Sequence, residues 1–250
     1  MRFHVAGAIM VVWLLAPAAG RAGPPYQTDD PEPVAYQHWE VYVASQLRAA
    51  GQVTEGTAPH VEVNYGIVPD VQLHVIAPVA FARANHMTRF GFGDAELGVK
   101  VRFVQERDGV PMIGTFPLVE VPTGSATSGL GNGAAQVFLP LWLQKHWGSW
   151  QTYGGGGYGI NRATGGKDWW YAGWQAQYAF PSVATLGVET YYATSHTQGG
   201  TRDLACNVGL VLDLTGHHHV LLSAGRDLLG PVQFQSYVAY QLTFGRHGGL

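Results

Sequence analysis

Four charged residues in the stretch 93–103 share one face of an extended strand. Asp94, Glu96, Lys100 and Arg102 stand at even positions, so a strand would project them to one side, whereas a helix would scatter them. Carboxylates and cations on one wall can pair with each other or bind a polar solute, provided that water or a partner reaches them. The odd positions between them are apolar, namely Ala95, Leu97, Val99, Val101 and Phe103. The spacing therefore predicts a wall with one polar side and one wholly apolar side.

The same alternation recurs along the chain. It returns in residues 61–65, 71–75 and 232–244, each time with aliphatic or aromatic side chains on one face and polar side chains on the other. Segments of about ten residues that alternate in this way, separated by turn residues, are typical of outer-membrane β-barrels. A soluble β-sandwich also alternates, so the pattern alone leaves that alternative open.

The composition favours the membrane barrel. Only 12% of the residues are charged, about half of the roughly 25% usual for a soluble domain, while the chain holds 34 glycines and 8 tryptophans. No segment after the N-terminus supplies the roughly 20 continuous apolar residues that a membrane-spanning helix needs. We therefore expect an all-β fold, a transmembrane antiparallel up-and-down β-barrel. The net charge of -3 and the absence of a basic run give no support for a nucleic-acid partner.

Turn residues divide the chain into about twelve strands, an even number as in bacterial single-chain barrels. The expected strands are residues 35–47, 59–67, 71–83, 91–104, 110–121, 133–146, 150–160, 169–180, 183–195, 202–214, 218–228 and 232–244. Short connections alternate with mostly longer ones rich in Gly, Thr and Ser. The longer set is expected to form the extracellular loops, at residues 49–58, 84–90, 122–132, 161–168 and 196–201.

The two ends of the chain add segments outside the barrel. Residues 1–22 have a positive start, a short apolar core and small residues before a cleavage site after Ala22, which predicts a secretory signal peptide. Residues 23–34 are rich in proline, and two interpretations stay open: a periplasmic tether, or a plug in which Asp29 or Asp30 meets a cation of the lumen. The barrel itself is expected over residues 35–244, followed by a tail at 245–250.

Several longer motifs resemble a known family. They are residues 23–33 and 91–100 (Gly-Phe-Gly-Asp-Ala-Glu-Leu-Gly-Val-Lys), 116–124 (Phe-Pro-Leu-Val-Glu-Val-Pro-Thr-Gly), 139–145 and 153–157. Over nearly the whole mature chain these residues are similar to outer-membrane transporters of the meta-pathway of phenol degradation family. The resemblance implies a barrel channel or transporter linked to the uptake of aromatic compounds, and it specifies the scaffold better than the cargo.

The inward-facing residues of such a barrel are the candidate functional site. A barrel of about twelve strands has a lumen between filled small barrels and open porins, so we expect a narrow path. One interpretation is that its charges only hold the lumen together; the other is a polar constriction flanked by aromatic faces for a planar solute. The candidate lumen residues are Glu40, Glu62, His74, Asp94, Glu96, Lys100, Arg102, Trp142, Trp169, Tyr171, Glu189 and Tyr191.

Two other functional classes remain as alternatives. One is a non-conducting structural or adhesive barrel, and the other is a lipid hydrolase of the outer membrane. Ser195 and His196 are adjacent, and neighbours in a strand point to opposite faces, so they cannot form a nucleophile and base pair. We accordingly expect no enzyme activity and no cofactor, and no metal site at the run 217–219 either, because it falls at a predicted turn.

The expected partners follow from the barrel. They are outer-membrane lipid, a small-molecule solute and the barrel assembly machinery. The last of these is expected because hydrophobic or aromatic residues alternate toward the end of the last strand, at Val238, Tyr240, Leu242 and Phe244. No connection is long enough for the large inward-folded loop of trimeric porins, which favours a monomer.

Overall fold

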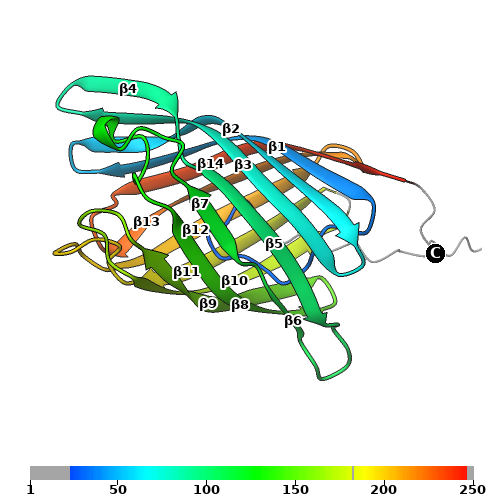
Figure 1. Ribbon diagram of the computed structural model, residues 1–250. Helices are drawn as coiled ribbons and strands as arrows, with labels where there is room; N and C mark the ends of the chain where they lie inside the picture. The colour runs from blue at the N-terminus through cyan, green and yellow to red at the C-terminus, as the bar shows by residue number, and fades with distance from the viewer. Residues whose placement is uncertain (1–22, 182, 247–250) are drawn as a thin grey trace, which may run out of the picture.

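The computed structural model describes residues 23–181 and 183–246 and forms a closed antiparallel β-barrel of twelve strands (Figure 1). The expected signal peptide, residues 1–22, lies outside the described residues. The strand segments are β1 (His38–Ala50), β2 (Val53–Val68), β3 (Val71–Ala84), β4 (Met87–Phe92), β5 (Ala95–Val104), β6 (Met112–Thr115), β7 (Leu118–Val121), β8 (Gln136–Trp147), β9 (Trp150–Asn161), β10 (Trp169–Phe180), β11 (Ala184–Ala193), β12 (Asp203–Asp213), β13 (His218–Leu229) and β14 (Phe234–Gly245).

Fourteen segments make twelve strands because two strands are interrupted. β4 and β5 pair with successive parts of β3, and β6 and β7 both lie between β5 and β8. β1 then pairs with β14 from His38 opposite Gly245 to Ala49 opposite Phe234, which closes the sheet on itself. A single closed sheet excludes the β-sandwich alternative.

The apolar faces point outward and the polar faces point inward. Leu97, Val99 and Phe103 are 48%, 40% and 56% exposed, whereas Lys100 on the same strand is 4% exposed. Trp147 and Trp170 also lie on the outer surface, at opposite ends of their hairpins. Exposed aliphatic and aromatic side chains around a polar interior are the arrangement of a barrel surrounded by lipid, and the chain is accordingly a transmembrane barrel.

Two predicted loops are wrong. Residues 49–58 belong largely to a long hairpin, in which β1 continues to Ala50 and β2 begins at Val53. Residues 84–90 likewise contain the turn between β3 and β4. These segments carry Gly, Thr and charged residues and lack a continuous apolar face. They extend the strands beyond the apolar outer surface that faces lipid. Without that face, their composition resembles that of a loop.

The two ends of the barrel differ. The terminal end carries the start of β1, the end of β14 and the short connections, such as residues 69–70 and 148–149. The loop end carries residues 122–135, with the 3-10 helix η1 (Ala126–Ser128), and residues 162–168 and 194–202. Among the described residues, no helix is long and apolar enough to cross a membrane.

Residues 23–34, here called the luminal segment, lie inside the barrel. Figure 1 shows this dark blue chain behind the front strands, within the ring of the sheet. The side-chain hydroxyl of Tyr26 donates to the carbonyl of Gly209 on β12 at 3.2 Å, and the backbone N–H of Val34 donates to the side-chain oxygen of Gln72 on β3 at 2.8 Å. These two contacts place the segment across the interior. Both contacts join residues far apart in the sequence, so the segment bridges opposite parts of the wall.

Candidate functional site

The luminal segment is bound to the wall at Glu189 of β11. The backbone N–H groups of Gln27 and Thr28 each donate to a carboxylate oxygen of Glu189 at 2.9 Å, and Asn207 donates to the same carboxylate from β12. The Thr28 hydroxyl lies 3.0 Å from the hydroxyl of Tyr171 on β10. Hydrogen bonds from backbone N–H groups to a buried carboxylate are among the stronger ones, so this contact fixes the segment on one wall.

A second attachment is electrostatic. The Lys100 ammonium on β5 donates to Asp29 at 2.9 Å and to Asp30 at 3.1 Å, and it lies 4.9 Å from the centre of the Phe116 ring. Asp30 is completely buried. Both candidate plug carboxylates therefore meet the same lumen cation.

Further along the segment, Glu32 accepts a hydrogen bond from Gln144 of β8 at 2.8 Å. It also lies 3.9 Å from the guanidinium of Arg102. The segment is thus held along its length by β5, β8, β11 and β12.

Glycines on the inner wall make room for the segment. A Cβ added at Gly209 would lie 2.5 Å from a ring carbon of Tyr26, closer than real Cβ atoms approach other atoms. A Cβ at Gly187, the register partner of Gly209, would collide with the Tyr26 hydroxyl, and one at Gly173 would collide with the Thr28 hydroxyl. We call Gly173, Gly187 and Gly209 the glycine recess. Glycine inside a strand here permits the close approach of another chain segment.

A cavity of about 730 Å³ runs beside the luminal segment. At the terminal end its lining includes His38 and Gly245, and at the loop end it includes Arg48 and His196. Most of its wall comes from β1, β2, β3, β5 and β14, opposite the glycine recess. The cavity therefore extends between the two ends of the barrel, with the segment forming one side.

Carboxylates line the middle of this cavity. His74 stands between two of them, with its Nε2 3.0 Å from Glu96 and its Nδ1 3.7 Å from Glu62. Glu62 also accepts a hydrogen bond from Asn64 at 2.8 Å, and Glu40 on β1 accepts one from the hydroxyl of Tyr42 at 2.7 Å. The polar wall predicted from the sequence is present on neighbouring strands.

Aromatic rings line the cavity toward the loop end. The Trp169 ring is stacked between Phe138, with ring centres 4.9 Å apart, and His196, at 4.1 Å. Tyr171 and Tyr191 are stacked with centres 5.6 Å apart. Burial, and secondly the charge of Arg48, lower the pKa of His196 to about 4, so this loop residue is neutral at pH 7. Flat, uncharged rings in a row suit a planar apolar solute.

The structure brings together most of the predicted site residues. Eight of them line the cavity: Glu40, Glu62, His74, Glu96, Lys100, Trp169, Tyr171 and Tyr191. Among the described residues, four predicted ones are not part of that lining. Glu189 is covered by the luminal segment, and Trp142 is buried beside Tyr171 with ring centres 6.1 Å apart.

The other two predicted residues outside the lining organise connections. Arg102 donates to Asp70 of the β2–β3 turn through Nε at 2.8 Å, so it lies at the terminal end and not at a central constriction. Asp94 accepts the backbone N–H groups of Gly124 at 2.8 Å and Asn132 at 2.6 Å, which shapes the loop between β7 and β8. Strand alternation predicts that these side chains face inward, but it does not predict their depth.

Several residues of the site were missed. Tyr26, Thr28 and Glu32 contact the wall from the luminal segment, and Tyr237 and Gln241 line the cavity from β14. The alternation of residues 232–244 does place Tyr237 and Gln241 on the polar face, which was an available signal. The luminal segment has no periodicity that could predict which of its residues contact the wall.

Ser195 and His196 do not act as a pair. The Ser195 hydroxyl donates to the carbonyl of Thr197 at 2.7 Å, while the His196 ring stacks on Trp169. The geometry offers no support for a hydrolase at this position.

A family model described as "Putative MetA-pathway of phenol degradation" matches residues 47–243, which is most of the barrel. The chain belongs to this family. No curated protein is significantly similar to it.

Solved structures with a similar fold are barrels from outer membranes. The COG4313 outer membrane channel from Pseudomonas putida F1 has a TM-score of 0.73 at 15% identity, covering 86% of this chain and 98% of that one. The NanC porin has a TM-score of 0.60 at 9% identity, covering 81% and 98%, and the KdgM porin 0.53 at 11% identity, covering 83% and 99%. At these identities the likeness concerns the fold.

Proposed function

We propose that this protein is an outer-membrane channel for small hydrophobic or aromatic molecules. The observation that carries the proposal is the cavity of about 730 Å³ whose lining extends between the two ends of the barrel. The stacked rings of Phe138, Trp169 and His196 support an aromatic solute, because ring faces bind planar apolar molecules at little conformational cost. The family's association with phenol degradation and the similar fold of an outer membrane channel from Pseudomonas putida F1 support this proposal.

The proposed location and orientation follow from the exterior and from the connections. An apolar outer face requires lipid, and a leader like residues 1–22 would deliver the chain to the periplasm for insertion by the barrel assembly machinery. We place the terminal end of the barrel in the periplasm, because short turns lie on that side in outer-membrane barrels. The protein would act as a monomer without a cofactor.

In this proposal the luminal segment narrows the path. It fills the side of the lumen next to β9–β12 and leaves the cavity on the side of β1–β3 and β14. Its attachments are hydrogen bonds and ion pairs, to Lys100 and Arg102 among others, and none is covalent, so they can break and reform without unfolding the barrel. The segment would therefore set the width of the path, and a plug is favoured over a periplasmic tether.

Reconstitution tests the proposal. Purified protein in liposomes should admit small aromatic molecules, such as phenol or toluene derivatives, faster than protein-free liposomes do, and planar bilayers should show single-channel currents. Liposomes that contain an unrelated eight-stranded barrel control for leakage at the protein surface. If neither the full chain nor a variant without residues 23–33 passes ions or solutes, the non-conducting structural barrel is the better conclusion.

A further inference from the structure

The charges along the cavity are unequal. Six carboxylates line it, from Asp29, Glu32, Glu40, Glu62, Glu96 and Asp203, against the cations of Lys100 and Arg48. Lys100 is already bound by two aspartates, and Arg48 lies 3.7 Å from Asp203. Neither cation therefore neutralises the carboxylates in the middle of the path.

Among the described residues, His74 is the only ion-pair partner of Glu62 and Glu96, and Glu40 has none. Among the described residues, no Lys or Arg is within ion-pair distance of any of the three, and His74 contacts only Glu62 and Glu96. Even a fully charged His74 balances one carboxylate of the three. A surplus of negative charge in a narrow lumen raises the local concentration of cations and repels anions.

Unused polar atoms lie beside these carboxylates. Gln241 and Tyr237 on β14 line the cavity and are 1% and 4% exposed. Within the described part of the chain, neither the Oε1 of Gln241 nor the hydroxyl of Tyr237 has a hydrogen-bond partner. Gln241 uses its amide N–H only to donate to Tyr42, whose own hydroxyl donates to Glu40. Buried polar atoms without partners are costly, and both residues belong to the lining of the cavity.

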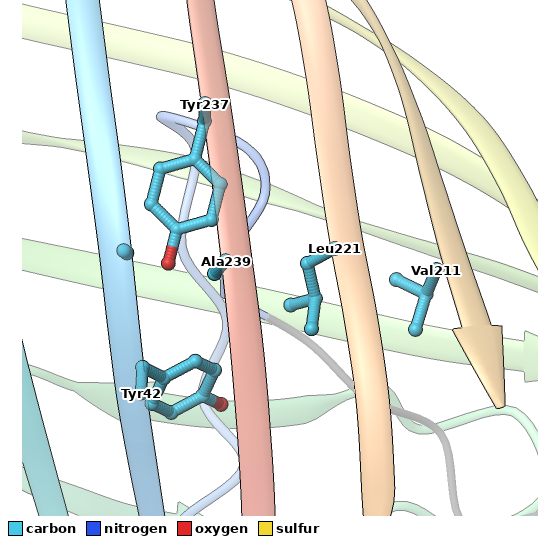
Figure 2. Close-up of a cluster of buried hydrophobic side chains, with 6 residues drawn as sticks. Tyr42, Val211, Leu221, Tyr237 and Ala239 are labelled. Atoms are coloured by element: carbon cyan, nitrogen blue, oxygen red, sulfur yellow. The ribbon is translucent and has the colours of Figure 1, made fainter. Parts of the chain in front are cut away.

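An apolar surface adjoins the same group. Ala44, Ala239, Leu221 and Val211 are register neighbours on β1, β14, β13 and β12 and form one buried inward row. Figure 2 shows Tyr42 and Tyr237 projecting from β1 and β14 on the same side as Leu221 and Val211. Ring faces and aliphatic groups next to carboxylates can hold a cation together with an apolar body.

We propose that this part of the cavity is a binding site for organic cations, specifically for ammonium groups carried on an aromatic or aliphatic body. Glu40 and Glu62 bind the ammonium group, and the Oε1 of Gln241 accepts a hydrogen bond from it. The rings of Tyr42 and Tyr237 cover the apolar body of the ligand. The inference deepens the proposed channel function, since it names the charge that the path prefers.

Equilibrium dialysis of the purified full-length protein tests the site with three probes of similar shape: 2-phenylethylammonium, neutral 2-phenylethanol and anionic phenylacetate. We expect the ammonium to bind at least about tenfold more tightly than either analogue. Equal binding of the neutral or anionic probe overturns the proposal, and this comparison needs no variant.

Variants then locate the site. The pair Glu40→Gln and Glu62→Gln should weaken ammonium binding at least about tenfold, because both compensating charges are lost. The pair Glu106→Gln and Asp108→Asn removes two negative charges at the β5–β6 connection, outside the cavity lining, and should leave binding unchanged. Unchanged binding in the first pair contradicts the assignment.

Reversal potentials in a KCl gradient separate this inference from the proposed function. A conducting barrel that prefers potassium over chloride, and loses most of that preference in the Glu40→Gln and Glu62→Gln pair, supports both. A conducting barrel without charge preference overturns the inference alone. A barrel that binds the ammonium probe selectively but never conducts overturns the channel and leaves the binding site standing.

Discussion

The two sides of the lumen use different polar chemistry. On β9–β12, where the luminal segment packs, buried amides bond to one another: Gln175 donates to Gln177 at 2.8 Å, and Gln177 donates to Gln151 at 2.5 Å. On β1–β3 and β5, beside the cavity, the carboxylates of Glu40, Glu62 and Glu96 and the ring of His74 stand beside the amides of Asn64 and Gln72. Neutral amides can satisfy each other without water, whereas unpaired carboxylates need it. The comparison indicates that the first side holds the luminal segment and that the second faces a hydrated path.

Removing the segment changes this comparison most completely, since one side of the lumen then loses what it holds. A variant that keeps residues 1–22 but lacks residues 23–33 should show a single-channel conductance at least about threefold higher, because the lumen gains the cross-section that the segment fills. Planar bilayer recording measures this. A periplasmic tether instead predicts an unchanged conductance.

Lys100→Met should free the segment without removing it. The substitution leaves Asp29 and Asp30 in the lumen without their cation, and breaking a buried ion pair from one side is strongly destabilising. We expect the probability of the wide, open state to rise about tenfold or more, since each 1.4 kcal/mol changes a population tenfold.

The deletion background provides the control for Lys100. Once residues 23–33 are gone, the two aspartates are absent, and Lys100→Met should no longer change the fraction of time in the open state. An equal effect in both backgrounds would mean that Lys100 acts on the barrel wall and not through the segment.

Filling the glycine recess should have a moderate effect. Gly187→Ala with Gly209→Ala places methyl groups where Tyr26 packs, and overpacking of this kind costs about 1–3 kcal/mol, so channel openings should become about fivefold more frequent or more. Gly216→Ala is the matched control, because a Cβ there has no atom within 4 Å among the described residues. Opening rates that rise equally in the control variant would argue against the recess.

The smallest expected effect concerns the aromatic row. Trp169→Leu removes a ring stacked between Phe138 and His196 but keeps an apolar side chain, so the flux of an aromatic solute relative to an aliphatic one of the same size should fall about two- to fivefold. Liposome flux with paired solutes measures this ratio. An unchanged ratio would assign the row to packing alone.

The barrel could be predicted because its signal is local. A period of two places Leu97 and Lys100 on opposite faces whatever the rest of the chain does, and turn residues mark the strand ends. The extended hairpins at residues 49–58 and 84–90 could not be recognised, since strands beyond the apolar belt lose the two-sided pattern. Strand number was therefore easier to predict than strand length.

The site was only partly predictable, because depth along the barrel is set by register. The inward direction of Arg102 follows from alternation, but its pairing with Asp70 at the terminal end depends on how β5 is offset from the β2–β3 turn. The expectation that Asp29 or Asp30 meets a cation followed from charge alone. The partner of Gln27 and Thr28, Glu189, lies more than 160 residues away in the sequence and has no local signal.

The luminal segment is covalently joined to the wall it blocks. Only residues 35–37 separate it from β1, so a displaced segment stays within a few residues of its binding surface, at an effective concentration in the millimolar range for such short links. A separate peptide of the same sequence would have to be supplied at comparable concentration to compete. Each opening would consequently be self-terminating, and the pore would reset without any energy source in the outer membrane.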